Sequence, residues 1–335
     1  MRSDRVLLAH GSGGTMMREL IEVFVDRFGD EALKRMDDAA SLEIPPGRIA
    51  LSTDTYVVTP RFFPGGDIGR LAVAGTVNDV STSGATPLFL TVGFILEEGL
   101  PIEELGRILD SMTECAAEAG VRIVTGDTKV VERGHGDGVY INTAGVGVLA
   151  EGVDLSGAYC RPGDKVLLSG TLGDHGIAVM STREGLSFST DIVTDAAPLN
   201  RMIAAVLAAA PAVRCFRDPT RGGLASCLNE LASASGVSIT VDEGSVPVRE
   251  QVRGACEMLG YDVFQVANEG KMVAVVPADQ ADAALAAMKS APYGEDAALV
   301  GEVTEGPSGR VYVQTTFGAR RIMDMLVGEQ LPRIC

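Results

Sequence analysis

The sequence contains no tryptophan, and aromatic residues make up only 5% of its 335 residues. Proteins that bind single-stranded nucleic acid stack the bases on aromatic side chains, so this shortage argues against such a function. A formal net charge of -17 also argues against binding the phosphate backbone of a nucleic acid. Nucleotides are still compatible with this charge, because a divalent metal bridges acidic side chains to phosphates.

Long apolar runs are also missing. The longest nearly apolar run, MIAAVLAAAPAV at residues 202–213, is too short to cross a bilayer and contains a proline. It predicts a buried helix. The stretch MRSDRVLLAHGSGG at the start lacks the apolar core of a secretory signal. We therefore expect a protein without membrane association.

Cysteine pairs at metal-binding or redox spacing are absent. The six cysteines form no C-x-x-C motif, and the chain is too long for a disulfide scaffold. They are Cys115, Cys160, Cys215, Cys227, Cys256 and Cys335. These features predict a reduced cytoplasmic protein with several buried thiols. Cys335 does not fit this description, because it is the last residue of LPRIC, where an exposed thiol invites oxidation and disulfide exchange.

The patterns that are present predict a mixed α/β protein with two domains, the number that this length favours. Strands are predicted at 48–58, 88–96, 121–127, 139–150, 165–170, 237–241, 272–276, 299–303 and 310–313, and helices at 67–87, 101–120, 198–209, 222–234 and 278–290. The polar passage EGVDLSGAYCRPGD separates a domain at 1–150 from a second at 151–320. A tail at 321–335 follows.

The familiar nucleotide-binding signatures do not occur. The phosphate loop G-x-x-x-x-G-K-[ST], the dinucleotide motif G-x-G-x-x-G and the kinase loops are all missing. One candidate for a phosphate-binding loop is HGSGG, directly before the amphipathic helix pattern TMMRELIEVFVDRF. The loop residues are His10, Gly11, Ser12, Gly13 and Gly14. Backbone N–H groups at such a helix start can face an anion. The alternative is an entry loop with Ser12 or Thr15 as the helix cap.

Five aspartates lie beside small polar residues near predicted element ends or, for Asp79, inside an apolar helix pattern; they are Asp38, Asp54, Asp79, Asp127 and Asp218. An unpaired charge within such a helix is costly. A cap or a turn is the common role of any single aspartate. Together, their carboxylate oxygens suit Mg²⁺, which keeps waters and substrate phosphates among its ligands.

Two further ionisable residues have similar neighbours. Lys129 follows Asp127 in TGDTK, and Glu269 lies in ANEGK before a predicted strand. Each is either a solvated charge or ion pair, the usual state of these residue types, or a proton-transfer group in a dry site. The three histidines lack zinc-binding spacing. We expect His135 in a loop and His175 at a helix cap.

These motifs resemble those of the HypE family of hydrogenase maturation proteins, in the PurM-like (aminoimidazole ribonucleotide synthetase) superfamily. The similar stretches are HGSGG, STDTYVV, FFPGGDIGRLAVAGTVNDVSTSGATP, GFILEEGLP, IVTGDTKVV, INTAGVGV, SGTLGDHG, TRGGL, NEGK and the terminal PRIC, in the family's order. They run from His10 to Cys335, and PRIC is specific to HypE within the superfamily. The resemblance implies an N-terminal α/β domain that forms a homodimer, a C-terminal α/β domain, and a nucleotide site near the domain and subunit junctions.

The resemblance also implies a reaction. A partner carbamoyltransferase, HypF, carbamoylates the terminal cysteine, here Cys335, and ATP then drives dehydration of the S-carboxamide to a thiocyanate. The cyanide passes to iron held by HypC and HypD, for the NiFe hydrogenase centre. A thiol suits this role because it is a good nucleophile and a workable leaving group. Phosphorylation by ATP turns the carboxamide oxygen, a poor leaving group, into a good one.

The resemblance further implies roles for single residues. Mg²⁺ is expected at Asp54, Asp79 and Asp127, with Asp38 and Asp218 in support, although Asp37 competes with Asp38 for one position. Lys129 and Glu269 are expected to orient the amide nitrogen and remove its protons. Nucleotide contacts are expected at His10, Gly11, Ser12, Gly13, Gly14, Asn78, Thr128 and Asn268. The tail is expected to alternate between docked and free states, since other proteins must meet Cys335.

Two alternatives stay open. Another PurM-like ATP enzyme, such as a thiamine-phosphate kinase or a selenophosphate synthetase, would share the aspartates without the terminal cysteine. The synthetase usually carries its reactive residue in the N-terminal glycine-rich region, and LAHGSGGT has no cysteine. The second alternative is a carrier whose terminal thiol only docks to a partner, which would not need the Asp, Lys and Glu residues.

Overall fold

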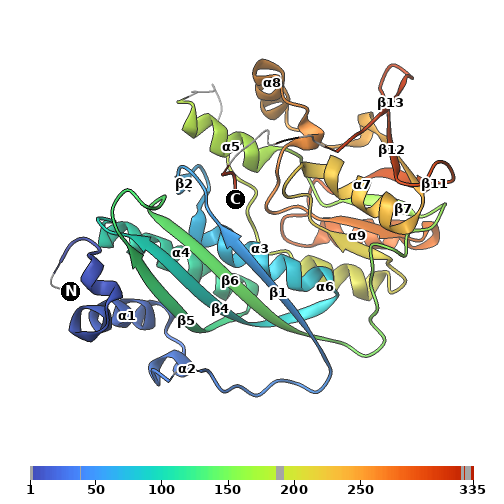
Figure 1. The fold of residues 1–335 in the computed structure, drawn as a ribbon. Coiled ribbons are helices and arrows are strands. Elements are labelled where there is room, and N and C mark those ends of the chain that lie inside the picture. The colour runs from blue at the N-terminus through green and yellow to red at the C-terminus, as the bar shows by residue number, and fades with distance from the viewer. Residues whose placement is uncertain (1–2, 38, 186–191, 326–327, 329–332) are drawn as a thin grey trace.

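The fold contains two large sheets, each with helices packed against it, and the two units lie side by side (Figure 1). The structure is a computed structural model that describes residues 3–37, 39–185, 192–325, 328 and 333–335. The N-terminal half contributes a four-stranded sheet, and the C-terminal half a seven-stranded sheet. This confirms the predicted mixed α/β class. Within the described part of the chain, no helix has the length and apolar character needed to cross a membrane.

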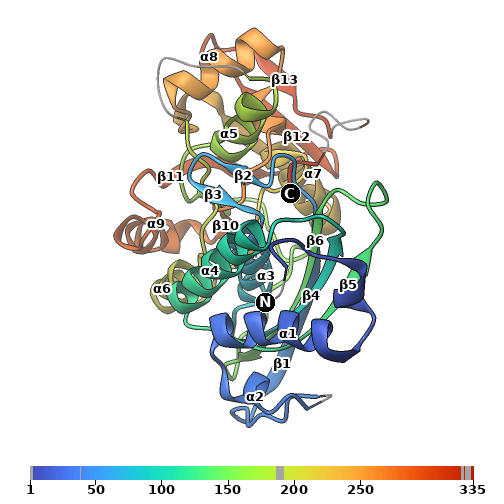
Figure 2. The ribbon, with the colours of Figure 1, turned by 90° about the vertical axis from the view of Figure 1, so that its left-hand side faces the viewer.

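The N-terminal sheet has the strand order β1-β6-β4-β5, so β1 and β5 form its opposite edges. The strands span Arg48–Tyr56 (β1), Ala85–Glu97 (β4), Arg122–Val131 (β5) and Val139–Leu149 (β6). β4 and β5 are parallel, and the other neighbours are antiparallel. The helices α3 (Ile68–Thr82) and α4 (Ile102–Ala119) lie on one side of this sheet, as Figure 2 shows.

The face of this sheet that α3 and α4 leave uncovered exposes apolar side chains. Along β1 the burial alternates, so that Tyr56 is buried whereas Ile49 and Leu51 are 51% and 69% exposed. Ile95 of β4 is 44% exposed. Alternation is expected of a sheet that packs on one face. Large apolar groups gathered on the other face indicate a surface for another molecule.

The C-terminal sheet has the order β13-β12-β9-β11-β7-β10-β8 and is covered on both faces. Helix α7 (Gly223–Ser235) shares a core with Val166 and Leu168 of β7, while α6 (Asn200–Ala209) and α9 (Ala281–Ser290) share one with Leu167. The strands span Lys165–Leu168 (β7), Cys215–Arg217 (β8), Ser238–Asp242 (β9), Val273–Val276 (β10), Ala298–Thr304 (β11), Arg310–Gln314 (β12) and Arg320–Ile322 (β13).

Shorter elements complete the fold. Helix α1 (Gly14–Phe28) packs next to α4, and its Phe24 ring lies 4.9 Å from the ring of Phe94 on β4. Helices α5 (Asp174–Arg183) and α8 (Glu250–Leu259) pack against each other. The rest are β2 (Phe62–Phe63), β3 (Gly66–Asp67), α2 (Glu31–Lys34) and the 3-10 helices η1 (Leu8–Gly11), η2 (Glu243–Ser245), η3 (Val263–Gln265) and η4 (Ala278–Gln280).

Most predicted elements are present near their predicted bounds, and the additions are α2, α5, α8, β2, β3, β8 and β13. Helix α5 escapes a periodicity search because nearly all its residues, 174–181, are buried and no polar face remains. β8 and β13 have only three residues each, too few to show alternation. The apolar run at 202–213 forms α6 up to residue 209, with one buried stripe. The five cysteines before Cys335 are buried, as predicted.

The packing of α3 on β1 gives a stability prediction. A Cβ on Gly75 would overlap the hydroxyl of Tyr56, which is buried. Gly75→Ala should therefore lower the free energy of unfolding by about 2 kcal/mol. The matched control is Gly254→Ala in α8, where a Cβ meets no atom within 4 Å. It should raise stability by about 0.5 kcal/mol. Denaturant unfolding measures both, and equal effects would contradict this account of the packing.

Candidate active site

The last residues of the chain, 333–335, lie between the two halves, at the position marked C in Figure 1. The backbone N–H of Thr59 donates to the Arg333 carbonyl at 3.3 Å, and that of Val57 donates to the Cys335 carbonyl at 3.4 Å. The segment thus extends the hydrogen bonding that follows the end of β1. In this structure Cys335 is in a docked position.

His175 holds the same segment from α5. Its ring is fully buried, with Nε2 2.8 Å from the Ile334 carbonyl and Nδ1 2.8 Å from the hydroxyl oxygen of Thr194. Because a carbonyl only accepts, Nε2 carries the proton and Nδ1 accepts from Thr194. Burial lowers the pKa of His175, which favours this neutral ring. The expected capping role is wrong, since His175 contacts the chain terminus instead. His135 lies in an exposed turn, as predicted.

The thiol of Cys335 lies beside the carboxyl group of Glu269, and each group affects the pKa of the other. Burial raises the pKa of both groups well above their usual values. The charges of Asp218 and Asp195 raise the pKa of Glu269 further. Oε1 of Glu269 is buried and has no hydrogen-bond partner among the described residues. The structure thus joins two residues that the sequence analysis assigned to catalysis.

Three of the predicted metal ligands surround this pair. Asp79 accepts a hydrogen bond from Ser52 Oγ at 2.8 Å, and Asp54 lies 3.7 Å from a guanidinium nitrogen of Arg221. Burial raises the pKa of Asp218 to about 6, and the charge of Asp79 adds to the effect. Burial also raises the pKa of Asp79, with a contribution from Asp54. We call this cluster, with Cys335 and Glu269, the thiol chamber.

The glycine-rich loop lies elsewhere, beside β5. A Cβ on Gly11 would lie 2.9 Å from atoms of Val130, so the loop passes close to that strand. Gly13 and Gly14 have φ values of 80° and 76°, which favour glycine. His10 is buried; its Nδ1 accepts from a backbone N–H at 2.9 Å, and its Nε2 has no partner among the described residues. Burial lowers the pKa of His10.

Asp127 and Lys129 project from β5 on the same edge. Their side chains form an exposed ion pair at 3.1 Å, and the hydrogen bond from Lys129 lowers the pKa of Asp127. Thr128, between them, is buried. Together with Phe24 and Phe94, it lines a small apolar cavity beneath α1. We call the loop 10–14 and residues 127–129 the loop cluster.

The thiol chamber and the loop cluster are separated by the sheet. Asp54 on β1 pairs with Thr143 of β6, and Asp127 on β5 pairs with Gly93 of β4. Because β1 and β5 are three strand spacings apart, the backbones of Asp54 and Asp127 are separated by about 14 Å. Asp54 shares the helix-covered face with Tyr56, whereas Asp127 is on the open face. The predicted set of metal ligands does not assemble within one chain.

A preformed metal site is also missing from the part of the chain that the structure describes. No group of three or more His, Cys, Asp or Glu there is close enough to hold a metal ion. Asp38, the fourth expected ligand, falls outside the described residues, and Asp37 is exposed.

The two asparagines expected at the nucleotide form hydrogen bonds with backbone groups. Asn78 donates to the Ala197 carbonyl at 3.0 Å and accepts from the Leu199 N–H at 2.7 Å, which ties α3 to the C-terminal half. Asn268 accepts from Gly173 N–H at 2.7 Å and donates to the Pro219 carbonyl at 3.0 Å. Both are buried, so in this structure neither faces open space.

Two functional candidates were not assigned from the sequence. Arg221, in the TRGG motif, is the cation beside Asp54, and its charge offsets part of the rise that burial causes in the pKa of the Cys335 thiol. Asp195 accepts the Glu269 backbone N–H at 3.0 Å and so positions that residue. The motif around Arg221 offered a signal. Asp195 has no such sequence signal, because it lies in an irregular segment that is far from Glu269 in the sequence.

The fold and the site define the class of the protein. The model of the AIR synthase related protein N-terminal domain matches residues 36–149, and that of the C-terminal domain matches residues 161–314. Among solved structures, a hydrogenase maturation protein HypE in complex with ATP superposes with a TM-score of 0.95 at 48% identity. The similarity covers 98% of this chain and 99% of that one.

The sequence relatives narrow the class to one family. The carbamoyl dehydratase HypE of Azotobacter vinelandii is 54% identical over 100% of this chain and 98% of its own. The structure of a HypE–HypF complex has a TM-score of 0.81 at 52% identity, over 93% of this chain and 100% of that one. The chain therefore belongs to the HypE family of carbamoyl dehydratases, the hydrogenase maturation proteins.

The burial of Asp218 makes stability depend on pH. Because its pKa is raised to about 6, the folded state binds more protons than the unfolded state between roughly pH 4 and 6. The free energy of unfolding therefore falls as the pH rises through that window. Asp218→Asn should remove this loss and raise stability above the window by on the order of 2 kcal/mol. Denaturant unfolding at several pH values measures it. Asp279→Asn, at an exposed position, is the control. The prediction would be refuted if the free energy of unfolding fell with pH as steeply in both variants as in the wild type.

The contact of His175 with Ile334 predicts how the terminal segment is released. His175→Ala removes the donor to the Ile334 carbonyl and should speed carboxypeptidase removal of Cys335 about tenfold, the effect of one buried hydrogen bond. His175→Gln keeps a donor and should retain most of the protection. Exposed His135→Ala should match the wild type. Equal digestion rates in the Ala and Gln variants would contradict an anchoring role for the hydrogen bond.

Proposed function

We propose that the protein uses ATP to dehydrate a carbamoyl group on its own Cys335 to a thiocyanate, and so supplies cyanide ligands for the iron of a NiFe hydrogenase. The observation that carries this proposal is the contact of the Cys335 thiol with the buried carboxyl of Glu269. The activity named for the Azotobacter relative and the ATP in the solved HypE complex support it.

The chemistry balances with Glu269 as the proton acceptor. The carboxamide oxygen attacks the γ-phosphorus of ATP, ADP leaves, and Glu269 takes one N–H proton as the C=N bond forms. The C–O bond then breaks, phosphate departs with the second N–H proton, and the thiocyanate remains. The net loss is one water. A raised pKa makes the ionised Glu269 a stronger base than an ordinary carboxylate.

Mg²⁺ fits the acidic side of the chamber. The ion commonly uses one or two protein carboxylates and completes its shell with phosphates and waters, so a preformed cage is not needed. Asp79 raises the pKa of Asp218, and Asp54 raises that of Asp79, a crowding of negative charge that a divalent cation relieves. When bound, Mg²⁺ neutralises the triphosphate charge. Asp54, Asp79 and Asp218 would hold it.

A homodimer would reunite the separated groups. The open face of the N-terminal sheet carries the exposed apolar residues Ile49, Leu51 and Ile95, which suit a second copy of this sheet. Such packing can place β5 of one subunit beside β1 of the other. The partner subunit's Lys129 would then orient the amide nitrogen in the thiol chamber, and the partner subunit's Asp127 and glycine-rich loop would bind the nucleotide.

The partners follow from the need to load and unload Cys335. One relative has been solved as a HypE–HypF complex, and we extend HypF to this chain as the carbamoyl donor, with HypC–HypD as cyanide acceptor. Residues 1–150 would form the nucleotide-binding and dimer domain, and residues 151–320 the second domain. Of the predicted tail at 321–335, residues 326–327 and 329–332 lie outside the described residues, and β13 includes its first two residues. Reduced buried thiols suit the cytoplasm.

One experiment separates this proposal from its rivals. The protein is incubated with HypF, carbamoyl phosphate and Mg-ATP, and the mass of the peptide ending at Cys335 is measured. We expect a carbamoyl adduct that loses one water only when ATP is present. A kinase would phosphorylate a separate small molecule, and a carrier would show no ATP-dependent mass change. Either result would overturn the proposal.

Glu269→Gln should separate loading from dehydration. The variant keeps the shape of the side chain but accepts no proton, so the carbamoyl adduct should accumulate while its dehydration slows at least about 100-fold. ATP binding, followed by calorimetry, should change little. Glu257→Gln, an exposed position on α8, is the matched control and should dehydrate at the wild-type rate. Full turnover by the Glu269 variant would exclude this residue as the base.

A further inference from the structure

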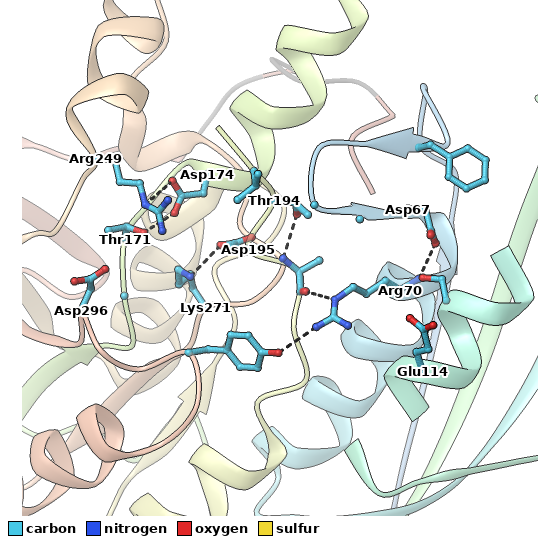
Figure 3. Close-up of a pocket in the computed structure, with 18 of the residues that line it drawn as sticks. Asp67, Arg70, Glu114, Thr171, Asp174, Thr194, Asp195, Arg249, Lys271 and Asp296 are labelled. Carbon is cyan, nitrogen blue, oxygen red and sulfur yellow. Dashed lines mark hydrogen bonds and ion pairs between the residues drawn. The ribbon is translucent and has the colours of Figure 1, made fainter. Parts of the chain in front are cut away.

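A second cavity, of about 650 Å³, lies between the two halves and is not lined by Cys335 or Glu269. The N-terminal half contributes residues of the β2–β3 hairpin, α3 and α4, and the C-terminal half contributes the loops before α5, α6 and α8. Figure 3 shows Arg249, Asp174, Asp195 and Lys271 together on the C-terminal wall, opposite Arg70. The volume is typical of small-molecule sites.

Two cations of this cavity, Lys271 and Arg249, have only distant carboxylate partners among the described residues. Lys271 is only 7% exposed, and its Nζ lies 3.6 Å from the nearest Asp195 oxygen. The Nε of Arg249 lies 3.5 Å from Asp174. Both distances exceed the usual 2.7–3.2 Å of a good N–H···O bond. Lys271 and Arg249 therefore have room to donate hydrogen bonds to an acceptor group of a ligand.

The paired carboxylates are equally incomplete. Oδ1 of Asp174 and Oδ2 of Asp195 are buried and have no hydrogen-bond partner among the described residues. The side chains of Asp174 and Asp195 are only 3% and 2% exposed. These are the oxygens that face Arg249 and Lys271 at 3.5 and 3.6 Å, so each has a charged neighbour but no hydrogen bond. A donor supplied from the cavity would complete both.

We propose that this cavity binds a small zwitterion of the free amino-acid type. Its ammonium group donates to the free oxygens of Asp174 and Asp195, and its carboxylate accepts from Lys271 and Arg249. A metal ion is unfavourable, because Arg249 and Lys271 lie within 3.6 Å of the two aspartates that would bind it. An anion alone would leave both aspartate oxygens unsatisfied, and a cation alone would meet the two nearby positive side chains. This proposal does not depend on the proposed dehydratase activity.

The wall of this cavity also touches the thiol chamber. Thr194 lines the cavity and donates to His175, which donates to the Ile334 carbonyl. Asp195 lines it too and accepts the backbone N–H of Glu269. A ligand that completes the hydrogen bonds of Asp195 would hold residues 194 and 195 in place between the cavity and the thiol chamber. Occupancy should therefore stabilise the docked position of residues 333–335, which makes the cavity a regulatory site.

The test is calorimetric titration of the full-length protein with each standard L-α-amino acid in turn. At least one should bind, and for that amino acid the matched amine without carboxylate and the matched acid without ammonium should each bind at least about tenfold more weakly. Asp174→Asn and Arg249→Gln should weaken binding to a similar extent. Arg253→Gln, an exposed position on α8 four residues after Arg249, should bind like the wild type.

A second readout tests the link to the chain terminus. Hydrogen exchange of residues 333–335 should slow when the best-binding amino acid is present, in the wild type and in Arg253→Gln, and should not respond in Arg249→Gln. Absence of binding by every amino acid, or equal binding by wild type and both cavity variants, would overturn the proposed site. Binding with unchanged exchange at residues 333–335 would overturn its regulatory role.

Discussion

The strand order of the N-terminal sheet is the constraint on which the account of this protein depends. With β6 and β4 in the middle, β1 and β5 are held at opposite edges. β1 delivers Asp54 to the thiol chamber, while β5 delivers Asp127 and Lys129 to the other edge and the other face. No side-chain movement closes a gap of about 14 Å across three strand spacings. The chemistry therefore needs either a second copy of the sheet or a different set of residues.

The thiol chamber is electrostatically unfavourable without its ligands. Asp79, Asp218 and Glu269 lose solvation and repel one another, and burial raises the pKa of each. Extensive apolar cores on both faces of the C-terminal sheet offset this cost. The same crowding prepares the chamber for a divalent cation and gives Glu269 a high affinity for a proton. Stability and activity thus make opposite demands on these acids.

The sequence predicts the class of fold and the residues of the site better than their arrangement. Long strands and amphipathic helices show clear periods, and the family motifs identify Cys335 and Glu269, which the structure brings into contact. The edge positions of β1 and β5 depend on pairing between distant segments, which no local pattern encodes. Asp195 and His175 act through backbone groups of Glu269 and Ile334, and such contacts exist only after folding. Asn78 and Asn268 lie in motif stretches, but the hydrogen bonds of Asn78 link the two halves and those of Asn268 join loops within the C-terminal half.

The central claim is that one active site combines the thiol chamber of one subunit with the loop cluster of another. Mixing the two inactive variants Lys129→Ala and Glu269→Gln, with subunit exchange, tests it most directly. Half of the resulting dimers contain both variants, and each of these has one site free of substitutions. The account predicts recovery of ATP-dependent dehydration to about a quarter of the wild-type rate. No recovery, with exchange confirmed by native mass spectrometry, would contradict it.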